Sequence, residues 1–225
     1  MRQTTCDMST CFFCRHCPKE WLELTRLHKQ TLQFKKGEVL FVEGSPTKGK
    51  YFINTGSVKV HKQWGPEKEL IIRFASAGDM LGFRGFEKEA YRASATALEA
   101  TEVCFIPNDH LEASLRMHAS LSYNLMQVYA TELQIAEQRM NDLAHRDVKG
   151  RVAEMLLMIQ DRFGEDENQF LHISISRQDI ASYAGTTYET VFKIFTDWTA
   201  QGWIRTEGKR ICILQKESLQ PFANH

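Results

Sequence analysis

The segment that most constrains the fold lies near the middle of the chain and repeats its apolar residues at alternating intervals of three and four positions. The repeat lasts for more than three heptads, which is typical of one long helix with a coiled-coil seam. Its members are Ala119, Ser122, Met126, Tyr129, Leu133, Ala136, Met140 and Leu143. A second apolar row on another face contains Leu121, Leu125, Val128 and Ile135. We expect one row to pack on the rest of the chain and the other on a second copy, with a helix buried wholly inside a monomer as the alternative.

The residues before this helix read as a succession of short strands. Between Leu32 and Ile106, runs of β-branched and aromatic residues are separated by glycines. The clearest runs are residues 39–42, 51–53, 57–60 and 70–74. Many short strands with turn signals between them predict a small all-β sandwich or jelly roll.

The residues after the long helix return to a helical pattern. Val148–Phe163 is predicted to form one helix with an apolar face made of Val152, Met155, Leu156 and Ile159. Ser176 and Asp179 have the spacing of a capping box and start a short helix, which Gly185 ends. A second capping box over residues 186–189 predicts the start of another helix.

Two short strands follow, at residues 203–206 and 210–214, joined by a turn at 207–209. Helix, turn, helix and hairpin together predict a winged helix-turn-helix. Ala181 and Val191 fall where such a motif needs a small and a branched core residue, with Gly185 at its turn.

The same pattern predicts which side chains contact DNA. The first turns of the second helix would present their outward residues to base edges in the major groove. The candidate DNA-binding residues are Arg177, Thr187, Tyr188, Glu189, Phe192, Lys193 and Lys209. Glu189 could accept a hydrogen bond from cytosine N4, and Lys193 could donate to guanine or to a phosphate. The alternative is that Glu189 only caps its helix and Lys193 is solvated.

Charge gives this prediction little support. The chain has 28 basic and 28 acidic residues. From Ser176 to Arg210 there are five basic and four acidic residues. Such a balance predicts modest nonspecific affinity for DNA, so a dimer should be needed for tight binding.

Localisation and reaction class follow from what the sequence lacks. Residues 1–17 have no apolar signal-peptide core, and no apolar run is long enough to span a membrane, so we expect a cytoplasmic protein with no membrane partner. We find no nucleophile–base pair, phosphate loop or metal-spaced His/carboxylate motif, so we expect no enzymatic activity.

The whole pattern resembles the Crp/Fnr family of bacterial transcription regulators. The motifs that carry the resemblance are residues 36–38, 41–44, 77–82, 147–151 and 189–191. The resemblance implies an α+β fold with a cyclic-nucleotide-binding-type β-roll (a jelly roll), a long dimerisation helix and a winged helix-turn-helix. It divides the chain into a cysteine-rich segment (1–20), a β-roll sensor domain (21–117), a dimerisation helix (118–146) and a DNA-binding domain (147–225). It also implies a homodimer on palindromic double-stranded DNA, contacts with RNA polymerase and a signal sensed by the β-roll.

The resemblance identifies an effector pocket but argues against cyclic AMP. In cyclic-AMP-binding members a Gly-Glu-Leu motif binds the ribose, and here that motif is Gly82-Phe83-Arg84, without the carboxylate. Tyr91, with Arg92 beside it, is expected at the phosphate-binding place. The base-binding pair of the dimer helix falls on Ala136 and Glu137, and a buried Glu137 would repel a phosphate. Because each lost anchor leaves bonding unmet, cyclic AMP is not expected to bind. A cyclic-nucleotide-binding module with another role is the alternative.

Clustered cysteines suggest a different signal. Cys11, Cys14 and Cys17 precede a proline, and the segment around Cys104 resembles the one that carries the central cluster ligand in Fnr. These four cysteines would hold a [4Fe-4S] cluster, with Cys6 as a substitute ligand. The wider spacing of the N-terminal ligands in Fnr is a departure. Redox-active thiols remain an equal alternative, and a zinc site a less favoured one.

Overall fold

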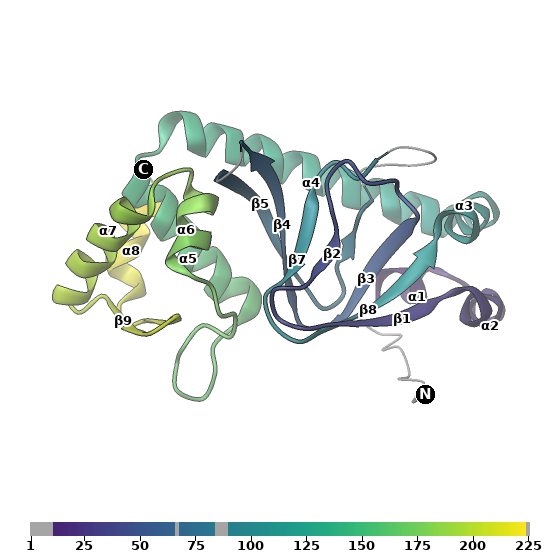
Figure 1. Cartoon of the computed structure of the whole chain (residues 1–225), viewed down its shortest axis with the longest axis horizontal. Coiled ribbons are helices and arrows are strands. Elements are labelled where there is room, and N and C mark those ends of the chain that lie inside the picture. The colour runs from purple at the N-terminus through teal and green to yellow at the C-terminus, as the bar shows by residue number, and fades with distance from the viewer. Residues whose placement is uncertain (1–10, 66–67, 84–89, 224–225) are drawn as a thin grey trace. The chain divides into compact units, whose positions relative to one another are not determined.

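The computed structural model describes residues 11–65, 68–83 and 90–223 (Figure 1). The chain divides into two compact units. The first consists of Met1–Glu67 and Ile72–Leu133, and the second of Lys68–Ile71 and Gln134–His225. The division falls within the long helix, so each unit contains part of that helix.

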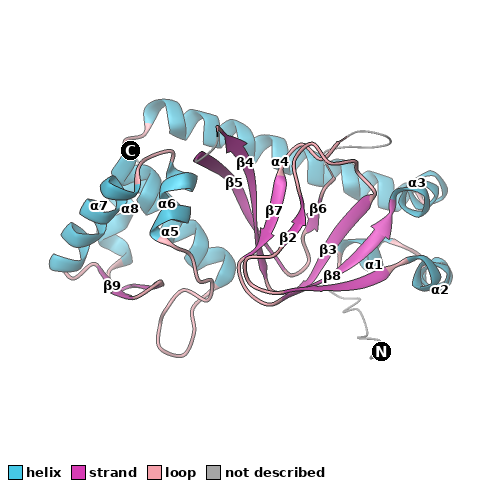
Figure 2. Cartoon of the chain, viewed as in Figure 1, coloured by secondary structure: helices cyan, strands magenta, loops and turns pink. Residues whose placement is uncertain are grey.

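The strands form two four-stranded sheets, which confirms the predicted jelly roll (Figure 2). One sheet has the order β1-β8-β3-β6 and the other β2-β7-β4-β5. The strands are β1 (Gln30–Phe34), β2 (Val39–Phe41), β3 (Gly49–Thr55), β4 (Ser57–Trp64), β5 (Lys68–Ser76), β6 (Met80–Leu81), β7 (Ser94–Ala97) and β8 (Thr101–Pro107).

Alternation along the strands divides the core of the β-roll into two clusters. On β3, Tyr51 and Ile53 belong to one cluster and Phe52 to the other. Val103 and Cys104 on β8 separate in the same way. Successive side chains of a strand point to opposite faces, so one face of this sheet packs inside the β-roll and the other against helices.

The helices on that second face were not predicted. They are α1 (Phe12–His16), α2 (Lys19–His28) and α3 (Asn108–Met117). Phe13 of α1 is fully buried, with its ring edge against Phe52 at a centroid distance of 5.8 Å. Trp21 of α2 donates a hydrogen bond from Nε1 to Oγ of Ser114 at 2.8 Å. The N-terminal segment is therefore part of the β-roll core from Cys11 onward.

The long helix, α4 (Ala119–His145), has the predicted length, but its two rows are sorted differently from the prediction. Leu121 and Leu125 are buried against the β-roll as expected, whereas Ile135 of the same row is 49% exposed. Tyr129, assigned to the dimer seam, instead packs edge-on against Phe83 and donates a hydrogen bond to its carbonyl. Tyr129 lies at the border between the two rows, where one residue can serve either face.

The second unit contains the winged helix-turn-helix that the sequence predicts. Its elements are α5 (Val148–Phe163), α6 (Arg177–Ala184), α7 (Tyr188–Ala200), β9 (Ile204–Glu207), β10 (Arg210–Ile213) and an unpredicted α8 (Lys216–Ala223). The capping box is present: Oγ of Ser176 accepts from the Asp179 amide, and Oδ2 of Asp179 accepts from the Ser176 amide. Gly185 is left-handed, with φ 63°, which explains why the turn takes glycine.

The second capping box does not form at residues 186–189. The N-cap is Thr187, one residue later than predicted, and its side chain accepts a hydrogen bond from the amide of Thr190. Two threonines in succession offer two possible caps, and the prediction chose the wrong one. Across the described residues, no helix is long and apolar enough to cross a membrane.

Candidate functional site

Helix α7 has one buried face and one exposed face. Val191, Ile194 and Trp198 are almost wholly buried and hold the helix on the core of its unit. The predicted DNA-binding residues of this helix point the other way: Tyr188, Glu189, Phe192 and Lys193 are exposed, as is the cap Thr187. The outward face of α7 can therefore enter a groove without any rearrangement of its own unit.

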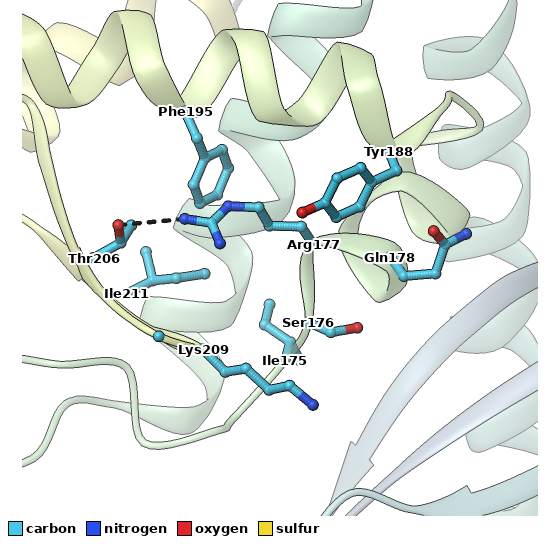
Figure 3. Close-up of a pocket in the computed structure, with 10 residues that line it drawn as sticks. Ile175, Ser176, Arg177, Gln178, Tyr188, Phe195, Thr206, Lys209 and Ile211 are labelled. Carbon is cyan, nitrogen blue, oxygen red and sulfur yellow. Dashed lines mark hydrogen bonds between the residues drawn. The ribbon is translucent and has the colours of Figure 1, made fainter.

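Arg177 connects this helix to the wing. It extends from the start of α6 between rings of α7 toward β9, where it donates to Oγ1 of Thr206 at 3.4 Å (Figure 3). Its guanidinium lies 5.6 Å from the centre of the Phe195 ring. Tyr188 and Lys209 line the same cavity, which has a volume of about 170 Å³. Arg177 is half-buried, so it positions the wing against the helix as well as adding positive charge beside it.

Several acidic groups near α7 are already engaged. Asp197 binds Nζ of Lys149 at 3.1 Å, which lowers the pKa of its carboxyl group. Asp166 binds Arg210 at 2.6 Å. The exposed Glu189 keeps a pKa below its usual value because its own backbone amide and Thr187 donate to it and Lys193 lies near. Glu189 is therefore ionised at neutral pH and can act as an acceptor.

The predicted effector pocket is nearly filled by aromatic rings. Phe41 stacks on Tyr91 at a centroid distance of 4.2 Å and on Tyr51 at 5.3 Å. Oη of Tyr91 donates to the carbonyl of Gly49 at 3.0 Å. A Cβ atom placed on Gly82 would lie only 2.9 Å from the Tyr91 ring. The remaining cavity is about 30 Å³, against roughly 300–1,000 Å³ for a typical small-molecule site.

Four of the predicted effector residues meet at this cavity. Gly82, Phe83, Tyr91 and Arg92 line it, and Arg84 lies outside the described residues. Ala136 and Glu137 are exposed on α4 in the single chain. They belong to the second compact unit, so their part in the pocket and the burial of Glu137 stay predictions.

Sequence reasoning missed a charged pair at this cavity. Arg73 of β5 lines the cavity, donates to the Met80 carbonyl at 2.8 Å and forms an ion pair with Glu132 of α4. Both side chains are largely buried, at 13% and 14% exposure. An arginine in a strand and a glutamate in a heptad helix carry no pattern that pairs them, since 59 residues separate them.

Four of the five candidate metal-binding cysteines belong to one apolar cluster. Cys11, Cys17 and Cys104 are buried there, and Cys14 packs against it from a half-buried position. Cys6 lies outside the described residues. Burial raises the pKa of the Cys17 thiol to about 11. Within the part of the chain that the structure describes, no three His, Cys, Asp or Glu side chains form a group that could hold a metal ion.

Two family models match the chain, one for each half. A cyclic nucleotide-binding domain matches residues 31–118, and a Crp-like helix-turn-helix domain matches residues 150–222.

Relatives of known function and fold match over most of their length. The chain is 32% identical over 203 residues to the transcriptional activator protein anr of Pseudomonas aeruginosa, covering 89% of this chain and 83% of that protein. It is 31% identical over 193 residues to a CRP-like cAMP-activated global transcriptional regulator of Mycobacterium tuberculosis, covering 84% and 86%. The structure of FixK2 from Bradyrhizobium japonicum superposes with a TM-score of 0.77 at 26% identity, covering 86% of this chain and 96% of that one.

Proposed function

The chain belongs to the Crp/Fnr family of transcription regulators, and we propose that it binds a palindromic operator as a homodimer and contacts RNA polymerase there. The family and its relatives are DNA-binding regulators and not enzymes. The observation that carries the proposal for this chain is the face of α7: Glu189 and Lys193 are exposed at the turns that would meet base edges, while Val191 and Ile194 hold the helix from behind.

A stripe on α4 supports the dimer. Met126, Leu133 and Met140 are 63%, 60% and 67% exposed and lie seven residues apart. Large apolar side chains at a strict heptad interval gain most when a second helix covers them. Between Leu133 and Met140 the seam carries the small Ala136, which lets two such helices approach closely there.

The dimer is tested by Leu133→Glu, which places a charge in the stripe. We expect this variant to sediment as a monomer and to lose palindromic binding. Ile135→Glu is the matched control, because Ile135 is also exposed but faces away from the stripe. In parallel, selection from random duplexes should enrich a palindrome with the unaltered chain. A monomeric unaltered chain, or no enriched palindrome, would refute the proposal.

We propose further that cyclic AMP is not the signal, although one relative is named as cAMP-activated. The stacked rings of Phe41 and Tyr91 line the cavity and leave it small, and the motif at Gly82 lacks a carboxylate. Calorimetric titration with cyclic AMP should give no heat of binding. Tight binding would overturn this part of the proposal.

The N-terminal cysteines with Cys104 are our proposed signal site, holding an iron–sulfur cluster. The donor set suits one, since four thiols gather in one apolar cluster. Burial raises the pKa of Cys17 in the metal-free chain, so this thiol would have to lose its proton on ligation. Because no described group of three such side chains could hold a metal ion as it stands, we expect the segment 11–17 to repack when a cluster binds. A bound cluster would supply oxidant-sensitive chemistry there.

Metal analysis decides between the alternatives. Protein purified without oxygen should contain stoichiometric iron and sulfide, and Cys104→Ser should contain neither. Cys212→Ser is the matched control, because Cys212 is equally buried but lies on β10 in the second unit. Stoichiometric zinc without iron would show that the cysteines form a zinc site. A metal-free protein would show that they are free thiols that hold no metal.

A further inference from the structure

An aromatic pair on α7 is unexpected on a DNA-binding surface. Tyr188 is 42% exposed and Phe192 is 51% exposed. Their rings lie 6.4 Å apart between centroids, with an angle of 23° between their planes. Within the described residues from 148 to 223, Leu214 is the one other large apolar side chain with comparable exposure. The apolar surface of this domain is therefore concentrated on its DNA-facing helix.

The chemistry of the major groove restricts what such rings can contact. Base edges there present hydrogen-bond donors and acceptors, and the C5-methyl group of thymine is the apolar exception. A ring pressed against any other base edge would strip water from a polar group without replacing its hydrogen bond. Phe192 has no polar atom with which to compensate, and it lies one turn from the helix start.

We infer that Tyr188 and Phe192 are specificity residues that contact thymine methyl groups in each operator half-site. This inference rests on the proposed function, since it requires that α7 enters the major groove. The rings are separated by about two base-pair steps of ~3.4 Å, so they can contact two thymines within about three consecutive base pairs.

The neighbouring residues complete the contact surface. Glu189 and Lys193 are adjacent in sequence to the two rings and are likewise four residues apart. The ionised Glu189 offers an acceptor to the amino group of cytosine or adenine, and Lys193 offers a donor to guanine or to a phosphate. Helix α7 therefore alternates apolar with charged contacts along its exposed face. We expect the operator half-site to combine thymines with at least one base pair that is recognised by hydrogen bonds.

Deoxyuridine substitution tests this inference with the full-length dimer. Uracil differs from thymine by the methyl group alone, so each half-site thymine is replaced in turn in the selected operator, and affinity is measured by fluorescence anisotropy. We expect one or two positions to lose about fourfold in affinity, the effect of one buried methyl group. Phe192→Ala should remove the sensitivity at one position, and Phe192→Leu, which remains apolar, should keep part of it. Leu214→Ala is the matched control and should behave as the unaltered chain, since Leu214 lies beyond the wing.

The possible results separate this inference from the proposed function. If an operator is enriched and bound but every deoxyuridine substitution leaves affinity within twofold, the methyl contact is refuted and the proposed function stands. If a sensitive position remains equally sensitive in Phe192→Ala and in Tyr188→Ala, the contact belongs to other residues and the assignment is refuted. If no operator is enriched, both the proposed function and the inference fail.

Discussion

The DNA-binding helices and the β-roll differ in how far apart the residues that define them lie in the sequence. In the first, Ser176 bonds Asp179 three residues away and Gly185 turns the chain between adjacent helices. In the second, the cavity is closed by Tyr91, whose hydroxyl bonds the carbonyl of a residue 42 positions away. A short-range motif can be recognised in a sequence, whereas the contents of a cavity depend on contacts that no local pattern records.

This difference has a functional counterpart. Most of the side chains that we propose to contact DNA are presented by one helix, α7, whereas the residues that line the predicted effector pocket come from several strands. In the predicted effector pocket the stacked rings of Phe41 and Tyr91 line a cavity of only about 30 Å³. We propose that α7 reads the operator while the rest of the domain positions this helix.

The largest effect is expected from Trp198→Ala, because Trp198 is fully buried on the inner face of α7. Its truncation should lower the free energy of unfolding of the second unit by about 3–5 kcal/mol. Phe192→Ala, on the outer face of the same helix, should change it by less than about 0.5 kcal/mol. Denaturant titration monitored by far-ultraviolet circular dichroism measures both. Equal losses would mean that the two faces of α7 are not distinct.

The next effect concerns Cys17 and its reactivity. Its pKa is raised from 9.0 to about 11, so at pH 8 the folded, metal-free chain should be alkylated about 100-fold more slowly at Cys17 than the unfolded chain. A raised folded-state pKa stabilises the protonated form, so this contribution to stability is present below pH 9 and is lost as the pH rises toward 11. Mass spectrometry of iodoacetamide-treated protein measures the rate. A midpoint near pH 9 in the folded chain would contradict the burial of Cys17.

Ser176→Ala tests how much a short-range contact, the capping box of α6, contributes to stability. The substitution removes the hydroxyl that accepts from the Asp179 amide at the start of α6, which should cost about 1 kcal/mol. The loss should appear in the melting of the second unit and leave the first unchanged. Ser176→Thr, which keeps the hydroxyl, serves as the control and should restore most of the stability. A loss of stability confined to the β-roll would contradict this prediction.

Tyr91→Phe tests the contribution of a long-range contact in the β-roll and should have an effect similar in size to that of Ser176→Ala. It deletes the hydrogen bond to the Gly49 carbonyl and keeps the ring stack, so the β-roll should lose about 0.5–1.5 kcal/mol. Tyr51→Phe, which deletes a bond to the Leu40 carbonyl, should cost a similar amount. Neither variant should gain affinity for cyclic AMP, because both rings remain. A variant that gains it would show that the hydroxyl alone closes the cavity.

The sequence analysis predicted the elements marked by local signals. The jelly-roll strands, the bounds of α5, the capping box at Ser176 and the buried positions Ala181 and Val191 all agree with the structure. Those residues are specified by periodicity, cap chemistry and glycine geometry, which act over a few positions.

The structural features that the sequence did not predict depend on contacts between residues that are far apart in the chain. Helix α3 follows a proline at the end of a strand, and its packing on α2 through Trp21 and Ser114 joins residues 93 positions apart. The ion pair between Arg73 and Glu132 likewise joins residues that are far apart in the sequence. The position of Tyr129 on the β-roll was missed because one residue at the border of two helix faces can serve either. The cysteine cluster was predicted as a group, but the arrangement of its thiols was not, since that arrangement depends on how α1 packs.

The role of α7 in reading bases is tested by comparing Glu189→Ala with Lys209→Ala on the selected operator and on its single-base variants. We expect Glu189→Ala to relax discrimination at one base pair by about 1–3 kcal/mol, whereas Lys209→Ala should weaken binding to all sequences alike and reduce the salt slope by about 1. If Glu189→Ala weakened binding to every sequence equally, α7 would hold the DNA backbone without reading the bases, and the proposed role of α7 would be wrong.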